Sequence, residues 1–399
     1  MNIFYDIPTE NWYHTHENAE LFAGSAEEEI SYKKDHSNQP LIPITIFPGN
    51  RMLTVGILTV SNPKKESGLG GNLTLFRDLS LYLLKHGILA YVFTGNALHS
   101  ESSMKGYLFS SISNKWIECK VPFPDIVYNR IPWRSYEASE EFQHLITHFK
   151  DYRMTLFNPC FIDKYVMFEA LTEDGSLTNH LPPTMVLRNS GCLDSFLETY
   201  RHIYLKPCKG SQGKGIYTII KNDDDTLLFN SLKHSESFPD FASFWETKKR
   251  DLLKRSYLAQ QAIIPKKLFG HRYDYRILVH YEKGFYKVTG KAVRMSQTQE
   301  ITTHTPRGGK LFPYQDLKSK NLDLKLAKLA QKCGEILSKK IGFLGEFSID
   351  IGEDESGSLF IYEVNSKPMQ FDEEEIETNR LLHLKNLFIE LSFPNLKRK

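Results

Sequence analysis

The chain has 399 residues, of which 41% are hydrophobic, 25% charged and 13% aromatic, and this composition excludes a disordered or collagen-like protein. Its 50 Lys and Arg against 48 Asp and Glu give a net charge of +2, so charge favours neither nucleic acid nor an anionic membrane as a partner. Apolar stretches such as 53–60 are much shorter than the roughly 20 residues of a membrane-spanning helix, and the first residues, MNIFYDIPTE, lack a secretory signal. We therefore expect a cytoplasmic protein.

The hydrophobic pattern near residue 50 predicts a parallel α/β unit. The run 53–60 is typical of a buried strand, 72–87 of a helix that ends at glycine, and 88–93 of a second buried strand. A later strand of the same sheet is expected at 125–131. The loop 61–72 is rich in glycine but matches neither GxGxxG nor GxxxxGK[ST], so we interpret it as a flexible loop at the sheet edge where a substrate enters.

The second half of the chain predicts more strands and a long helix. Strands are expected around a glycine-rich turn and beyond it, at 202–207, 215–220 and 257–264. Residues 274–295 are typical of a hairpin that turns at Lys283-Gly284. An amphipathic helix is expected over 322–340, followed by a second hairpin over 347–365.

The last hairpin carries a pattern of polar side chains that suggests a metal site. If residues 355–358 form its loop, Asp350 lies directly opposite Glu363, and Asn365 shares a face with Glu363. Like charges directly opposed in a sheet destabilise it, unless a cation lies between them. Magnesium prefers one or two carboxylates together with waters and phosphate oxygens. The alternative is a polar sheet face with solvated acids.

A glycine-rich segment with several lysines, 206–215, suggests phosphate binding. Glycine lets the backbone approach a phosphate chain closely, and lysine adds positive charge. The candidate residues are Lys206, Lys209, Gly210, Ser211, Gly213, Lys214 and Gly215. A strand rather than a helix follows, so this is not a Walker loop. The alternative is an ordinary hairpin tip.

Two arginines of the 274–295 hairpin are candidates for binding a phosphoryl or carboxylate group. Arg276 shares a face with Asp274, and Arg294 lies on the other arm. Arginine offers a rigid, bidentate donor pair to such oxygens, although a surface ion pair across the hairpin is the alternative. Lys164 follows Asp163, a candidate helix N-cap, and by itself suggests no function.

Taken in order, these pieces resemble the ATP-grasp superfamily, and within it the YheC/YheD endospore coat-associated family. The likeness covers nearly the whole chain after about residue 50. The segments that carry it are GILTV (56–60), PFPDIVYNRIPWR (122–134), LFNPCFIDKYVMFEAL (156–171), LPPTMVLRN (181–189), YLKPCKGSQGKGIYTI (204–219), DYRILV (274–279), Arg307-Gly308-Gly309 and IYEVNSKP (361–368).

The resemblance implies a role for most candidates, with ATP lying between two α+β subdomains. Lys164 and Lys206 look like the lysines that hold the α- and β-phosphates, under a lid loop at 209–215. The resemblance further implies an adenine-binding hinge at Gln261, Ala262 and Ile263, arginines for the γ-phosphate and an acyl-phosphate at Arg276 and Arg294, and magnesium ligands at Asp350, Glu363 and Asn365. Residues 265–268 lack the carboxylate that often holds the ribose, and Gln261 stands where glutamate is common.

The resemblance also implies a fold and an activity. We expect an α/β (α+β) chain divided into an appended segment (1–50), a pre-ATP-grasp domain (51–155), a linker helix with the lid subdomain (156–262) and a C-terminal subdomain with the metal site (263–399). The expected activity is an ATP-dependent carboxylate–amine ligase that uses two Mg²⁺ ions, or Mn²⁺, and an amino acid or peptide carboxylate. Spore-coat proteins are partners by family likeness. The alternatives are a non-catalytic, ATP-binding coat-assembly protein and a phosphotransferase.

Overall fold

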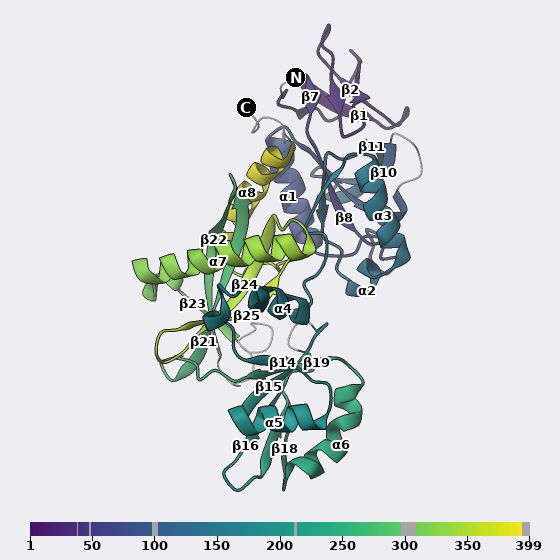
Figure 1. Ribbon diagram of the computed structural model, residues 1–399. Helices are drawn as coiled ribbons and strands as arrows, with labels where there is room; N and C mark the ends of the chain where they lie inside the picture. Colours follow the sequence, from purple (N-terminus) through teal and green to yellow (C-terminus); the bar gives the residue numbers. More distant parts are fainter. Residues whose placement is uncertain (38, 48, 98–102, 211–213, 297–308, 393–399) are drawn as a thin grey trace.

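The computed structural model describes residues 1–37, 39–47, 49–97, 103–210, 214–296 and 309–392. The chain is elongated, with the N-terminal strands at one end and a sheet with two covering helices at the other (Figure 1). Across the described ranges, no helix combines the length and apolar character needed to cross a membrane. The expected mixed α/β fold is confirmed.

The N-terminal segment forms two small sheets rather than an irregular stretch. One has the strand order β5-β2-β1-β6 and the other β4-β3-β7. The strands are β1 (Asn2–Asp6), β2 (Asn11–His14), β3 (Phe22–Ala23), β4 (Glu28–Glu29), β5 (Ser31–Tyr32), β6 (Ile42–Pro43) and β7 (Arg51–Met52). Most of these strands have only two residues, so they leave too little alternation to be recognised in the sequence.

The expected parallel α/β unit is confirmed. Strands β8 and β9 pair in parallel, β12 joins β8 in parallel, and every residue of these three strands is buried. The six-stranded sheet has the order β11-β10-β9-β8-β12-β13. Its elements are β8 (Thr54–Thr59), α1 (Leu73–Lys85), β9 (Leu89–Thr94), a 3₁₀ turn (Gly95–Ala97), β10 (Ser103–Ser110), β11 (Lys115–Pro122), β12 (Ile126–Asn129), α2 (Arg134–Glu137), α3 (Glu140–Asp151) and β13 (Thr155–Phe157).

The sheet at the other end of the molecule, here called the lid sheet, has the order β14-β19-β15-β16-β17-β18. Its core includes apolar side chains of α5 and α6, such as Leu193 and Phe244. The elements are β14 (Thr184–Val186), α5 (Ser190–Tyr200), β15 (His202–Pro207), β16 (Tyr217–Lys221), β17 (Leu227–Asn230), β18 (Ser235–Phe238), α6 (Phe241–Leu253) and β19 (Tyr257–Gln261). The strands expected at 202–207, 215–220 and 257–264 are therefore present.

The C-terminal sheet has the order β23-β22-β21-β24-β25, and β20 pairs with β21 outside this path. The hairpin of β21 and β22 turns at Lys283 and Gly284, both with positive φ, as expected. The elements are α4 (Lys164–Asp174), a 3₁₀ turn (Thr178–His180), β20 (Lys267–Leu268), β21 (His271–Glu282), β22 (Phe285–Ser296), β23 (Gly309–Phe312), a 3₁₀ turn (Tyr314–Asp316), α7 (Lys320–Ile341), β24 (Glu346–Glu353), β25 (Leu359–Asn365) and α8 (Glu374–Ser392).

Two helices connect the C-terminal sheet to the rest of the chain. Helix α7 presents the expected apolar face, and Leu326 and Cys333 share one core with Met167 of α4. Helix α8 packs Leu384 and Phe388 into the core of the N-terminal α/β domain (Figure 1). The last helix of the chain is therefore part of both halves of the fold.

We predict that Gly334→Ala destabilises the protein, although alanine normally stabilises a helix by about 1 kcal/mol relative to glycine. Gly334 lies in α7, and a Cβ there would approach ring atoms of Tyr286 to 2.4 Å. Overpacking of this kind costs about 1–3 kcal/mol. Gly191→Ala in α5 is the matched control, because its Cβ would meet no atom closer than 3.7 Å. Urea unfolding of both variants measures the difference, and an equal midpoint for both would contradict the prediction.

Candidate active site

The candidate site lies where the hairpin of β24 and β25 brings two carboxylates together. Asp350 pairs directly with Glu363, as the sequence predicts. The loop differs from the expected one, because Asp354 N–H donates to Ser358 O (3.0 Å) and Glu353 pairs with Leu359. This register alone would set Asp350 out of line with Glu363, but an irregularity between Asp350 and Ile351 restores the pairing.

The irregularity is a β-bulge that leaves Tyr362 without a paired residue. Ile351 pairs with Ile361 while Asp350 pairs with Glu363, so β25 has one extra residue, Tyr362, between these two pairs. A bulge of this kind changes the direction of neighbouring side chains. As a result, Tyr362 and Glu363 both line one cavity, which strict alternation would not allow.

The cavity, of about 80 Å³, lies between the lid sheet and the C-terminal sheet. The register of β21 brings charged side chains to this cavity, because Arg276 pairs with Asp350 and Asp274 pairs with Arg294. Of the residues predicted from the sequence, the structure brings together around this cavity Lys164, Lys206, Gln261, Ile263, Arg276, Arg294, Asp350 and Glu363.

Lys164 is the first residue of α4, so the start of this helix fixes the position of Lys164. The Asp163 side chain caps the helix by accepting from the N–H of Tyr165. The Lys164 Nζ donates to Glu363 Oε1 (2.6 Å) and to Gly210 O (3.1 Å), and its side chain is 7% exposed. A nearly buried ammonium group paired with a carboxylate is a different environment from the solvated helix end that its sequence context suggests.

Lys206 lies at the end of β15 and extends into the same cavity. Its Nζ donates to Gln260 Oε1 (2.5 Å), and Gln260 Nε2 in turn donates to Thr184 Oγ1 (2.9 Å). Burial lowers the pKa of Lys206 to about 8, against the opposing effect of Glu363, and Lys164 and Arg272 lower it further. An anionic ligand would raise this pKa and so favour the charged amine.

Asp350 and Arg276 form a loose pair with unused hydrogen-bonding atoms. Arg276 Nη1 lies 3.9 Å from Asp350 Oδ1, and burial lowers the pKa of Arg276. Within the described residues, Asp350 Oδ1 and Arg276 Nε are buried and have no hydrogen-bond partner. Buried polar atoms normally have partners, so this pair fits a site that receives a cation on the carboxylate and an anion on the guanidinium.

The donor set suits a hard divalent cation with few protein ligands. Over the described residues, no group of three or more His, Cys, Asp or Glu side chains could hold a metal ion. Asp350 and Glu363 would supply two carboxylates to such a cation, and the remaining ligands would be waters or substrate oxygens. Magnesium is bound in this way at phosphate-binding sites.

Several predicted residues lie outside the cavity lining. Asn365 pairs with Ser348 in the sheet. Ala262 lies between the lining residues Gln261 and Ile263, and its N–H donates to His202 O (2.9 Å). Residues Lys209, Gly210 and Lys214 line a neighbouring cavity. Gly215 has a positive φ of 74° at the start of β16, and Ser211 and Gly213 lie outside the described residues, as does the Arg307-Gly308 turn.

The structure adds cavity residues that the sequence analysis missed. Arg272 Nη1 donates to the Tyr204 hydroxyl (2.8 Å), and its guanidinium lies 6.0 and 5.7 Å from the ring centres of Tyr204 and Tyr362. The Lys206 ammonium lies 5.4 Å from both rings. The alternation of Arg272, Asp274 and Arg276 along β21 was the available signal, since all three share a face.

Comparison with known proteins identifies the family of this chain. The sequence matches the protein-family model described as "YheC/D like ATP-grasp" over residues 153–390. The chain belongs to this family. The matched range includes both sheets of the ATP-grasp fold and every predicted site residue from Lys164 to Asn365.

Two curated relatives are similar to this ATP-grasp chain over most of its length. The endospore coat-associated protein YheD of Bacillus subtilis (strain 168) is 29% identical over 317 residues, which is 73% of this chain and 69% of YheD. The endospore coat-associated protein YheC of the same strain is 24% identical over 277 residues, which is 66% of this chain and 76% of YheC.

A solved structure shows the same fold. The VanG D-Ala:D-Ser ligase from Enterococcus faecalis is 11% identical, with a TM-score of 0.50 over 86% of this chain and 99% of VanG. At this identity the likeness concerns the fold alone. The predicted fold class, an α/β chain with the ATP-grasp arrangement of two sheets, is confirmed.

Proposed function

We propose that this protein is an ATP-dependent ligase that joins a carboxylate to an amine through an acyl-phosphate. The observation that carries the proposal is the pairing of Asp350 with Glu363, each beside a cation: Arg276 at 3.9 Å and Lys164 at 2.6 Å. Opposed acids flanked by buried cations suit a metal ion that is held against a phosphate chain. The ATP-grasp family membership supports ATP as the nucleotide.

In this proposal the positively charged residues bind the phosphates and the acidic residues bind the metal ions. Lys164 and Lys206 would hold the α- and β-phosphates, while Arg276 and Arg294 would face the γ-phosphoryl group and the acyl-phosphate. Asp350 and Glu363, with Asn365, would hold two Mg²⁺ ions, or Mn²⁺ in their place. When bound, these ions would neutralise charge on the β- and γ-oxygens. Phosphoryl transfer depends mainly on positioning and charge neutralisation, so this site needs no covalent nucleophile.

The reaction has two steps. An oxygen of the substrate carboxylate attacks the γ-phosphorus, the bond to the β-phosphate bridge oxygen breaks, and ADP leaves. The amine then attacks the acyl carbon, phosphate leaves with the bonding electrons, and the nitrogen loses a proton. Both steps move negative charge, and Arg276 and Arg294 would donate hydrogen bonds to the oxygens that carry it.

Ion pairs in the free protein would exchange when the nucleotide binds. Lys164 donates to Glu363 in the free protein, so the ammonium and the carboxylate satisfy each other. On binding, the ammonium would turn to a phosphate oxygen and the carboxylate to the metal ion. This exchange would avoid leaving either buried charge without a partner.

The hinge at 261–263 would hold the adenine through its main chain. The amides of Gln261 and Ala262 already donate within the sheet, so the amide of Ile263, which lines the cavity, is the one we assign to the base. The carboxylate expected for the ribose is absent at 265–268, and we propose no residue for that role.

The relatives suggest the setting in which the ligase works. YheC and YheD are named endospore coat-associated proteins. We propose that this protein acts on an amino acid or peptide of the spore coat, as a cytoplasmic enzyme whose partners are coat components.

The direct test is product formation with a broad substrate mixture. The purified protein is incubated with ATP, Mg²⁺ and a mixture of amino acids and peptides, and ADP release is followed together with mass spectrometry of the products. A ligase forms an amide, and added hydroxylamine traps the acyl-phosphate as a hydroxamate. A stable phosphorylated product that resists hydroxylamine would instead indicate a phosphotransferase. Nucleotide binding without ADP release would indicate a non-catalytic coat-assembly protein.

We predict that nucleotide affinity falls as the pH rises above 8, because of Lys206. Its folded pKa of about 8 means that the free protein loses this charge above pH 8, whereas bound phosphates keep the amine protonated. Binding then requires proton uptake, which lowers affinity by up to about tenfold per pH unit. Titration calorimetry with Mg-ATP from pH 7 to 9.5 measures this dependence.

Two variants separate the charge of Lys206 from its position. Lys206→Arg stays charged over this range, so its affinity should vary little with pH. Lys206→Ala should bind nucleotide weakly at every pH. A wild-type affinity that stays constant from pH 7 to 9.5 would remove Lys206 from the phosphate site.

A further inference from the structure

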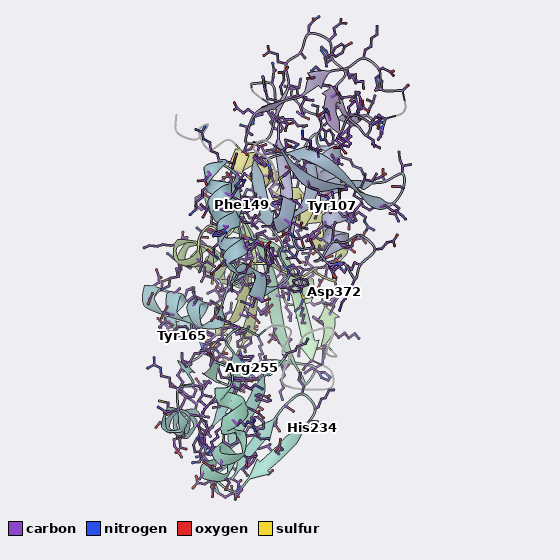
Figure 2. The ribbon with its side chains drawn as sticks, turned by 90° about the vertical axis from the view of Figure 1, so that its right-hand side faces the viewer. Tyr107, Phe149, Tyr165, His234, Arg255 and Asp372 are labelled. Atoms are coloured by element: carbon purple, nitrogen blue, oxygen red, sulfur yellow. The ribbon has the colours of Figure 1, made fainter. Side chains whose placement is uncertain are left out.

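A second, larger cavity of about 890 Å³ lies beside the glycine-rich segment 206–215, between α4 and one end of the lid sheet. β14 and β15 end here and β19 begins here, because Val186 pairs with Leu258 and Pro207 pairs with Tyr257. Figure 2 labels Tyr165 of α4 and Arg255 of the lid, which both line this cavity. Its volume is near the upper end of the range for ligand pockets, about 300–1,000 Å³.

The cavity lining combines an apolar part with unpaired positive charge. Val166, Val186 and Pro207 supply the apolar part. The cations of the lining are Arg188, Lys209, Lys214 and Arg255. No ion-pair partner is found for these four side chains among the described residues, whereas Lys248 and Lys249 of the neighbouring helix α6 are paired with Glu236 and Glu246.

Among the described residues of the lining, one acid, Asp163, offsets one of these four cations. Its carboxylate accepts from the N–H of Tyr165 as the cap of α4. The exposed residues Arg188 and Arg255 come from separate segments, one after β14 and one before β19, and both follow the same end of this antiparallel strand pair. The cavity therefore presents a net positive charge to solvent.

The edge of the lid sheet also offers main-chain groups. β14 is the last strand of the lid sheet in the described part of the chain. Its bonds to β19 include Leu187 N–H to Tyr257 O (2.9 Å) and Gln261 N–H to Pro183 O (2.9 Å). Alternate residues of an antiparallel pair share these bonds, so the main-chain groups of Thr184 and Val186 point away from β19. An extended peptide could pair with them.

We propose that this cavity binds an acidic peptide in an extended conformation. Its apolar side chains would contact Val166, Val186 and Pro207, its carboxylates would pair with Arg188 and Arg255, and its main chain would add to the edge of β14. Nucleic acid fits less well, because Tyr165 is the one aromatic side chain among the described lining residues, and single strands need successive stacking surfaces. The inference goes beyond the ligase reaction and does not depend on it.

The test measures binding of a defined peptide to the full chain. The probe is an acetylated and amidated octapeptide of alternating Glu and Leu, titrated by calorimetry in 0.1 M salt without nucleotide. We expect saturable binding, at least about tenfold weaker for Arg188→Glu/Arg255→Glu, because two attractions become two repulsions. The matched control is Arg250→Glu/Lys254→Glu, which changes the charge equally at exposed lid positions outside the cavity. It should bind as the wild type does.

Further probes test the chemistry and geometry of the ligand. An octapeptide of alternating Lys and Leu should not bind. Peptides N-methylated either at every Glu or at every Leu should differ in affinity, because only alternate amides of an extended peptide face the strand edge. Mg-ATP affinity should be the same in both double variants, which checks the fold and keeps this result separate from the ligase proposal.

Several outcomes would overturn the proposal. These are equal peptide affinity for the two double variants, equal affinity of the lysine peptide, no saturable binding of the acidic peptide, and tighter binding of an oligouridylate or of anionic phospholipid vesicles. Equal affinity of the two N-methylated peptides would exclude the strand pairing.

Discussion

Glu363→Gln should abolish Mg²⁺-dependent ADP formation, lowering the rate by at least about 10²–10³-fold. The amide keeps the shape of the side chain but removes the charge that opposes Asp350 and pairs with Lys164 at 2.6 Å. Without this carboxylate, the site has one acid left to hold a divalent cation against the phosphates. The measurement is ADP release with the substrate mixture, together with the Mg²⁺ dependence of ATP affinity by calorimetry.

The control for this variant is Glu335→Gln on the surface of α7, where the carboxylate is 46% exposed and pairs with Lys332. It removes the same charge and should leave ADP release and the Mg²⁺ effect unchanged. Substantial turnover by Glu363→Gln, or an ATP affinity that still responds to Mg²⁺ as in the wild type, would contradict the metal assignment.

Arg380→Met should lower the free energy of unfolding by about 3–5 kcal/mol, the usual cost of removing one partner of a buried ion pair. Arg380 and Glu346 are both fully buried. Arg380 Nε donates to Glu346 Oε1 (2.5 Å) and Nη2 to Glu346 Oε2 (2.9 Å), while the Tyr128 hydroxyl donates to the same carboxylate (2.6 Å). These contacts join α8, β24 and β12, so their loss should affect both halves of the fold.

Two further variants identify the cause of this destabilisation. Glu346→Met/Arg380→Met removes both charges and should be less destabilised than Arg380→Met, because the buried carboxylate is removed together with the cation that contacts it most closely. Arg130, which lies 3.6 Å from Glu346, keeps its hydrogen bond to Pro368 O. Arg77→Met, which breaks the exposed pair with Asp78, should change stability by less than about 1 kcal/mol. Urea denaturation measures all three. Equal loss in the single and double variants would show that packing, not charge, explains the effect.

The same ion pair should make stability depend on pH in the acid range. Burial by itself would raise the pKa of Glu346, but Arg380 and His280 together outweigh it and hold the pKa well below its ordinary value. A depressed carboxyl pKa stabilises the fold above the unfolded pKa, near 4.3, and this contribution is lost as the pH falls below it. Between pH 6 and 3, the wild type should therefore lose more stability than Glu346→Met/Arg380→Met.

The long periodic elements could be predicted from the sequence, whereas the short ones could not. The buried strands at 54–59 and 89–94 are long enough to show a continuous apolar run, and the helix at 320–341 is long enough to show a clear helical period. The two-residue strands of the N-terminal sheets, such as Phe22–Ala23, have no period to detect, and they form because neighbouring strands supply their hydrogen bonds.

The sequence was sufficient to predict that Asp350 faces Glu363, but not the path that produces this pairing. A loop that begins at Asp354 and a bulge at Tyr362 have opposite effects on the register, and they cancel. The bulge also turns Tyr362 into the cavity. Strand alternation describes regular pairing only, so this side chain could not be assigned from the sequence.

The sequence alone determined which residue types carry the chemistry: lysines beside glycines, arginines on a hairpin and opposed acids on the next one. Only the tertiary structure decided which of them meet. Lys164 and Glu363 are 199 residues apart in the chain and in contact in the fold, while Lys209 and Lys214 belong to the glycine-rich segment 206–215 with Lys206 but line a different cavity. The physical reason is that pattern and propensity act over a few neighbouring residues, whereas a charge site is assembled by packing of distant elements and by the need of buried charges for partners.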